Sequence, residues 1–134
     1  LRQVEYSLVD MRLHAEPGAE TDIQRVVDDV RSQVAVIHPP AFNRTLHSFS
    51  HIFAGGYSAG YYSYKWAEVM SADAFSAFEE AGLDKEEEVK KVGRLFRETV
   101  LSLGGGVNPM QVFMSFRGRA PAPEALLRHN GLSS

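Results

Sequence analysis

Apolar residues recur along most of the chain at spacings of three, four and seven, which place them on one side of an α-helix. In the first helix that this pattern predicts they are Leu1, Val4, Leu8 and Met11, and in the second they are Ile23, Val26, Val27, Val30, Val34 and Ile37. Pro17-Gly18 ends the first helix after about Ala15, and Pro39-Pro40 ends the second. Proline has this effect because it cannot donate the backbone hydrogen bond that continues a helix.

Capping residues and helix breakers outline the rest of the fold. Thr21 is suited to cap the second helix, with Asp22 in its first turn. Residues 41–56 show no period and predict an ordered loop with at most a short turn of helix. Further helices are expected over residues 57–80, from the cap Asp84 to the glycine run at 104–106, from Asn108-Pro109 to residue 116, and over residues 124–129. The sequence therefore predicts an all-α fold in which residues 1–134 form a single helical segment.

Composition narrows the functional class. The 134 residues are 44 % hydrophobic and 23 % charged, with a net charge of −3, which provides enough apolar material for a core. The basic residues are scattered, whereas nucleic-acid binding needs a clustered basic face, and no apolar run approaches the roughly 20 residues of a membrane span. The absence of cysteine excludes disulfides, thiolate metal ligands and a cysteine nucleophile. We therefore expect no nucleic-acid or membrane partner and a cytoplasmic location.

Three tyrosines mark one face of the helix predicted after residue 56. Tyr57, Tyr61 and Tyr64 are spaced i, i+4 and i+7. The residues expected to pack into a core from the opposite face are Tyr62, Trp66, Val69 and Met70. A phenol is a neutral donor at pH 7 and suits a peptide carbonyl oxygen that gains negative charge during hydrolysis. The residues alone favour the half-buried edge of a core for such a stripe, and the wall of a polar site is the alternative.

Two histidines and a glycine pair precede these tyrosines. His47 and His51 have metal-ligand spacing if their segment is helical. Ser48, however, stands where the zinc motif H-E-x-x-H requires glutamate, and that motif is absent from the chain. A role for His51 as a hydrogen-bond donor is therefore favoured. Gly55 and Gly56 permit a close backbone approach or a positive φ, which would suit either a bound substrate strand or tight helix packing.

Residues 51–66 read HIFAGGYSAGYYSYKW. This run resembles the signature of the thimet oligopeptidase family of zinc metallopeptidases, and its loop HIFAGGY is most similar to the branch of oligopeptidase A and dipeptidyl carboxypeptidase. The likeness extends over roughly residues 41–132. The downstream segments that carry it are 73–75, 93–97, 101–105, 116–121 and 125–128.

The resemblance implies the C-terminal helical part of a zincin-like oligopeptidase catalytic domain, which hydrolyses short peptides. In that family zinc is held by H-E-x-x-H and a later glutamate, and this chain contains no such motif. Zinc is thus expected in a full-length parent enzyme, and neither bound metal nor activity is expected for this chain alone. The helical pattern already under way at Leu1 agrees with a fragment of a longer protein. Endopeptidase and dipeptidyl carboxypeptidase activity both stay open.

Residue by residue, the resemblance implies catalytic roles for Tyr64 and His51, as donors to the developing oxyanion. It implies substrate binding for a second group, which comprises Tyr57, Tyr61, Gly55 and Gly56.

Two other functions stay open beside the peptidase. One is a non-catalytic helical interaction domain derived from such an enzyme, and the other is a small helical protein that binds a metal or ligand through His47 and His51. For the peptidase fragment the expected partners are short peptides. Self-association is also expected, through apolar surface that the rest of the domain would cover.

Overall fold

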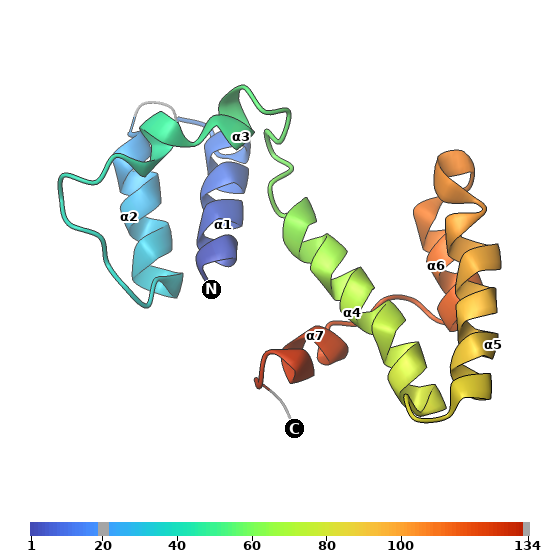
Figure 1. Ribbon diagram of the computed structural model, residues 1–134. Helices are drawn as coiled ribbons and strands as arrows, with labels where there is room; N and C mark the ends of the chain where they lie inside the picture. Colours follow the sequence, from blue (N-terminus) through green and yellow to red (C-terminus); the bar gives the residue numbers. More distant parts are fainter. Residues whose placement is uncertain (19–21, 133–134) are drawn as a thin grey trace. The chain divides into compact units, whose positions relative to one another are not determined.

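The computed structural model describes residues 1–18 and 22–132, and every regular element in these ranges is helical (Figure 1). The all-α prediction is therefore confirmed. The chain divides into two compact units, Leu1–Trp66 and Ala67–Ser134. This division does not test whether residues 1–134 are one segment of a larger catalytic domain, which stays a prediction. Among the described residues no helix is both long and apolar enough to cross a membrane.

The first unit is built on two helices that lie side by side, α1 (Arg2–Ala15) and α2 (Ile23–Val34) (Figure 1). The residues buried between them are Val9, Val27 and Val30, with Leu13, Val34 and Leu46 packed against these. The Asp22 carboxylate caps α2 by accepting the backbone N–H of Arg25 at 3.0 Å. The predicted cap Thr21 lies outside the described residues, and Asp22 is the cap instead of a first-turn residue.

The helix predicted to end at about Ala15 is confirmed, but it does not pack through the apolar residues whose spacing indicated it. Those residues, Leu1, Val4, Leu8 and Met11, are all exposed. The face that packs instead carries Tyr6, Val9 and Leu13 together with the buried Asp10. Because this face includes the charged residue Asp10, its sequence does not show the apolar periodicity that normally indicates a packed face. The end of α2 also differs, because Ala35 already adopts extended backbone ahead of Pro39-Pro40 and leaves Ile37 83 % exposed.

Two short helices and a run of turns follow α2. These are the 3₁₀-helix η2 (Thr45–Ser48) and α3 (Ser50–Phe53), and the turns continue to residue 62. The long helix α4 (Ser63–Ala81) begins at Ser63, so the start predicted at Tyr57 is wrong. Gly56 with φ of 80° and Ala59 with φ of 53° both have left-handed backbone, which no right-handed helix can contain. Helix α4 contributes residues 63–66 to the first unit and residues 67–81 to the second.

The second unit packs α4 residues with the helices that follow. These are α5 (Glu86–Phe96), the π-helical η3 (Arg97–Leu101), the 3₁₀-helix η4 (Gly104–Gly106), α6 (Pro109–Arg117) and α7 (Glu124–His129). Phe78, Phe96 and Phe116 meet with ring centroids 5.2 to 6.5 Å apart. The predicted cap Asn108 is confirmed, since its side chain accepts the Met110 N–H at 3.0 Å.

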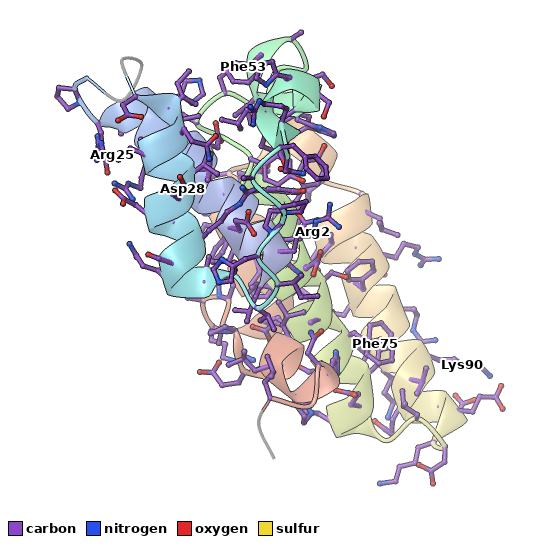
Figure 2. The ribbon with its side chains drawn as sticks, turned by 90° about the vertical axis from the view of Figure 1, so that its left-hand side faces the viewer. Arg2, Arg25, Asp28, Phe53, Phe75 and Lys90 are labelled. Atoms are coloured by element: carbon purple, nitrogen blue, oxygen red, sulfur yellow. The ribbon has the colours of Figure 1, made fainter. Side chains whose placement is uncertain are left out.

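Two further predictions about these helices are corrected. Lys85, and not Asp84, precedes the first residue of α5, and it makes no side-chain cap. Tyr62 and Trp66, predicted to pack into a core, are exposed. At the start of α5, Lys90 projects from the surface and pairs with carboxylates of the preceding turn (Figure 2).

One buried carboxylate organises the second unit. Asp73 is 1 % exposed and accepts two hydrogen bonds from Arg119 at 2.6 and 2.7 Å, one from Arg117 Nε at 3.2 Å and one from the Ala122 N–H at 2.8 Å. Burial alone would raise the pKa of Asp73, but the bonds from Arg119 and Ala122 outweigh it and lower that pKa below its ordinary value. Asp73 thus links α4 to the chain between α6 and α7.

Candidate functional site

Four aromatic side chains of the first unit converge on one another, and we call them the ring cluster: His51, Tyr57, Tyr61 and Tyr64. The His51 ring centroid lies 6.1 Å from that of Tyr57, 5.7 Å from that of Tyr61 and 6.1 Å from that of Tyr64. The Tyr57 and Tyr64 rings stack at 4.8 Å, and the Tyr61 and Tyr64 rings lie 5.2 Å apart. The structure therefore brings together all four side chains singled out from the sequence.

The route by which they meet differs from the predicted one. A single helical face was expected, whereas His51 comes from α3, Tyr57 and Tyr61 from the turns, and Tyr64 from the first turn of α4. The turns fold back over α3, because the Tyr57 N–H bonds to the His51 carbonyl at 2.9 Å. The Ser58 hydroxyl donates to the Ile52 carbonyl at 2.5 Å in the same region.

Members of the ring cluster differ in their access to solvent. Tyr61 is 7 % exposed, and its ring packs against Tyr6 at 5.9 Å and Phe49 at 4.9 Å. Tyr64 is 37 % exposed, Tyr57 is half-buried and His51 is exposed. Tyr61 therefore supports the cluster from beneath, while the other three side chains can meet a ligand.

The Tyr64 hydroxyl is held as a proton donor. A hydrogen bond with Tyr57, followed by burial and by the nearby phenols, raises the pKa of Tyr64 from 10.0 to about 12. At neutral pH the group is therefore fully protonated. A neutral phenol of this kind can donate to an oxygen that gains negative charge without first losing its own proton.

The glycine pair between α3 and Tyr57 is required by the local geometry. A Cβ atom at Gly55 would lie 2.8 Å from His51 Cα and 3.0 Å from the His51 carbonyl oxygen, so no side chain fits there. Gly56 has free space around it, but its φ of 80° is unfavourable for other residues. The pair thus serves to return the chain closely over His51, where the sequence left both a substrate contact and tight packing open.

A residue that the sequence interpretation missed holds this loop from outside. Asp10 of α1 is 0 % exposed, and its Oδ1 and Oδ2 accept the backbone N–H groups of Ala59 and Tyr61, each at 2.9 Å. The Nδ1 atom of His14 lies 3.0 Å from Oδ1. The sequence does carry one signal that could have found Asp10. This residue lies one helical turn after Tyr6 and next to Val9, on the same face of the first helix, where a charged residue is unusual unless it has a role.

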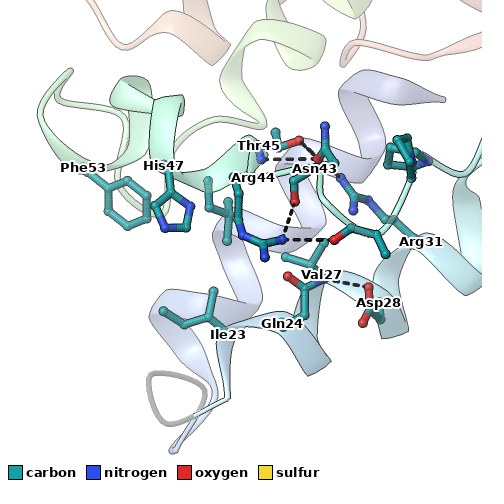
Figure 3. Close-up of a pocket in the computed structure, with 14 residues that line it drawn as sticks. Ile23, Gln24, Val27, Asp28, Arg31, Asn43, Arg44, Thr45, His47 and Phe53 are labelled. Carbon is teal, nitrogen blue, oxygen red and sulfur yellow. Dashed lines mark hydrogen bonds between the residues drawn. The ribbon is translucent and has the colours of Figure 1, made fainter.

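Within the described ranges no three His, Asp or Glu side chains gather to hold a metal ion. His47 lies in η2 and His51 in α3. His47 lines a cavity of about 740 Å³ bounded by α2 and residues 39–47, with Phe53 beside it (Figure 3). Arg44 also lines this cavity and donates to the Ala41 carbonyl at 3.0 Å. No member of the ring cluster lines the cavity, so the two features are separate.

Comparison with known proteins places the chain in a family. The sequence model of Peptidase family M3 matches residues 1–132. Two Arabidopsis thaliana proteins, named Probable cytosolic oligopeptidase A and Organellar oligopeptidase A, chloroplastic/mitochondrial, are each 59 % identical over 134 residues; the matches cover 98 % of this chain and 19 % and 17 % of those proteins. The Dipeptidyl carboxypeptidase of Escherichia coli is 34 % identical over 135 residues, covering 95 % of this chain and 18 % of that protein.

The chain therefore spans about a fifth of the length of these curated relatives. Both names that the run at residues 51–66 suggested, oligopeptidase A and dipeptidyl carboxypeptidase, occur among them. Since the family match covers almost the whole chain, the resemblance is confirmed, and the chain belongs to peptidase family M3.

Proposed function

We propose that this chain is the substrate-binding and oxyanion-stabilising part of a zinc-dependent oligopeptidase that hydrolyses short peptides, and that it works within a longer polypeptide. The observation that carries the proposal is the convergence of His51, Tyr57 and Tyr64, each with solvent access, in a chain of peptidase family M3. The length of the relatives supports the longer polypeptide. The name of one Arabidopsis relative supports a cytoplasmic location, while another is organellar.

In this proposal the ring cluster acts on the carbonyl of the bond to be cleaved. When water adds to the carbonyl carbon, the carbonyl oxygen becomes negatively charged. Tyr64 and His51 donate hydrogen bonds to that oxygen, and each donor is worth about 2.7–4 kcal/mol in the transition state. Tyr57 binds the substrate and orients the Tyr64 hydroxyl through their hydrogen bond. Gly55 and Gly56 let the peptide backbone approach beside them.

Zinc does not fit the residues at hand. Since the described ranges gather no three suitable ligands, we propose that the zinc ion of the full-length enzyme binds to other residues of the longer polypeptide. That ion would supply Lewis-acid chemistry to the hydrolysis. By itself this chain is expected to bind no zinc and to lack peptidase activity.

Apolar side chains on the first unit support the proposed self-association of the isolated chain. Val36, Ile37 and Phe42 are all highly exposed, and large apolar surface of this kind is normally covered by another protein surface. Light scattering at increasing concentration should show an apparent mass above 14.9 kDa. Replacing Ile37 and Phe42 by serine should restore a monomer, and a concentration-independent monomer before substitution would contradict the proposal.

The test of the catalytic role is Tyr64→Phe in the full-length protein that contains this chain. We expect kcat for a short peptide to fall on the order of 10²-fold while KM changes little, because the lost hydrogen bond forms mainly in the transition state. Tyr62→Phe is the matched control, since Tyr62 is exposed and outside the ring cluster. If Tyr64→Phe leaves kcat unchanged, the proposed role of the ring cluster is refuted.

A further inference from the structure

Asp10 is the most completely buried charged residue among the described residues of the first unit, and the proposed chemistry does not involve it. Its side chain is 0 % exposed, although a carboxylate is costly to bury unless all its partners are supplied. One partner is local, since His14 Nδ1 lies 3.0 Å from Oδ1, and the other two come from residues far along the sequence. The Ala59 and Tyr61 N–H groups each lie 2.9 Å from a different carboxylate oxygen, so both oxygens are committed to one loop.

The loop that Asp10 holds has a conformation that its own sequence does not favour. Ala59 has φ of 53°, a left-handed backbone that a residue with a Cβ atom rarely adopts. Residues in such conformations persist only when surrounding contacts hold them in place. The two hydrogen bonds that Asp10 accepts, one from the Ala59 N–H and one from the N–H two residues later, are contacts of that kind.

The position of this loop decides where the rings lie. Tyr57 precedes the segment that Asp10 holds, Tyr61 lies at the end of it, and Tyr64 follows it. The same face of α1 also supports the rings directly. Tyr6, one turn before Asp10, packs edge-on against the Tyr61 ring with the two ring centroids 5.9 Å apart. Helix α1 therefore supplies both a polar and an apolar support to the segment that joins Tyr57 to Tyr64.

We propose that Asp10 is a positioning residue of the peptidase: its carboxylate fixes the turns at residues 58–61 so that the Tyr57 and Tyr64 hydroxyls are set in place before substrate binds. The inference rests on the proposed function, and it adds a residue that touches neither substrate nor reacting atoms. Preorganised donors are effective because they do not have to reorient during the reaction. Loosening the loop should therefore affect turnover more than substrate affinity.

The experiment compares Asp10→Asn with Asp73→Asn in the full-length protein. Both carboxylates are buried and accept backbone hydrogen bonds, but Asp73 belongs to the second unit and its partners Arg117, Arg119 and Ala122 are residues of that unit. We expect Asp10→Asn to lower kcat on the order of 10²-fold with little change in KM, as a small displacement of catalytic groups can do. Asp73→Asn should leave kcat near the wild-type value.

A second readout separates positioning from general loss of structure. The hydrogen bond between Tyr57 and Tyr64 should weaken in Asp10→Asn, so the Tyr64 pKa should fall from about 12 toward its ordinary value. An NMR titration of labelled tyrosine would detect this. In Asp73→Asn the Tyr64 pKa should not move. The inference is overturned if the Tyr64 pKa is unchanged in Asp10→Asn, or if both variants lower kcat equally.

If Asp10→Asn fails to fold, an ester bond in place of the Ala59 amide provides the second variant. Incorporating lactic acid at position 59 deletes only the N–H that Asp10 Oδ1 accepts and keeps the carboxylate and the methyl group. A reduced kcat with a lowered Tyr64 pKa would support the inference, and wild-type values for both would overturn it. Because Tyr64→Phe tests the oxyanion role separately, the two proposals can fail independently. If Tyr64→Phe lowers kcat but the loop variants lower only the Tyr64 pKa, the positioning role of Asp10 is overturned and the proposed function stands.

Discussion

Replacing Asp73 by asparagine should destabilise the second unit by about 3 kcal/mol at neutral pH. The Arg119 side chain is 46 % exposed, so its bonds to Asp73 act as a surface ion pair worth at most about 1 kcal/mol. The Arg117 side chain is only 7 % exposed, and the Ala122 N–H donates to Asp73 at 2.8 Å. The hydrogen bonds that Arg117 and the Ala122 N–H donate to the buried carboxylate contribute about 1.5 kcal/mol each, the lower end of the range for a charged partner. In the Asp73→Asn variant Arg117 keeps its ion pair with Glu80 at 2.7 Å, so its charge is not left without a partner and the loss of stability is no larger.

The lowered pKa of Asp73 determines how its contribution to stability depends on pH. Because the folded protein lowers the Asp73 pKa, the contribution is fully present above the unfolded value of about 3.9. It is lost as the pH falls through the lower folded pKa, where the carboxylate becomes protonated. The difference in unfolding free energy between wild type and Asp73→Asn should therefore be constant from neutral pH to about pH 5 and disappear in stronger acid.

The assay is urea denaturation followed by far-ultraviolet circular dichroism, with hydrogen exchange of the α6 amides to assign the change to the second unit. Glu87→Gln is a suitable control, because Glu87 forms an exposed pair with Lys90 and should change stability by less than about 0.5 kcal/mol. The reasoning is refuted if Asp73→Asn costs no more than this control, or if its cost persists unchanged at pH 3.

Three further outcomes are expected. Gly55→Ala puts a methyl group 2.8 Å from His51 Cα, so it should cost about 1–3 kcal/mol and shift the His51 NMR signals. Tyr57→Phe removes the main cause of the raised Tyr64 pKa and should lower it from about 12 toward its ordinary value in an NMR titration. Asn108→Ala deletes the cap of α6 and should cost about 1 kcal/mol in thermal unfolding.

Each of these has a control within the chain. Gly105→Ala meets no atom within 4 Å and should leave the His51 signals unchanged. Tyr62→Phe alters an exposed phenol and should leave the Tyr64 pKa near 12. Asn108→Asp retains a capping oxygen and should preserve most of the stability. Equal effects of variant and control would contradict the corresponding explanation.

Local signals predicted most helices, and they failed where long-range contacts decide the backbone. The cap at Asn108 and the helix that follows it depend on neighbouring residues, so the sequence was sufficient there. The start of α4 was misplaced because Ala59 has no sequence feature that marks left-handed backbone. Its conformation accompanies a hydrogen bond that its N–H donates to Asp10, on a helix some fifty residues earlier in the chain, and no local pattern contains that information.

In the candidate site, too, residues with local sequence signals were predicted, and a residue that acts through long-range contacts was not. His51, Tyr57, Tyr61 and Tyr64 were found from the sequence, and the structure brings them together, although their functional roles stay predictions. Asp10 was missed because a search for catalytic chemistry looks for reactive groups near each other in sequence. Its contribution depends on burial, which only the packing of α1 reveals.

Leu13 of α1 and Leu46 of η2 each pack against two groups of buried residues, the one between α1 and α2 and the one formed by Phe49, Ile52 and Tyr61. This sharing has a consequence for protein engineering. A synthetic peptide of residues 49–66 would carry all four rings but neither leucine, and we expect it to be unstructured in water. Transplanting the ring cluster into another scaffold would therefore require a host helix that reproduces the packed face of α1. The smallest transferable unit is a three-dimensional one, not a contiguous sequence motif.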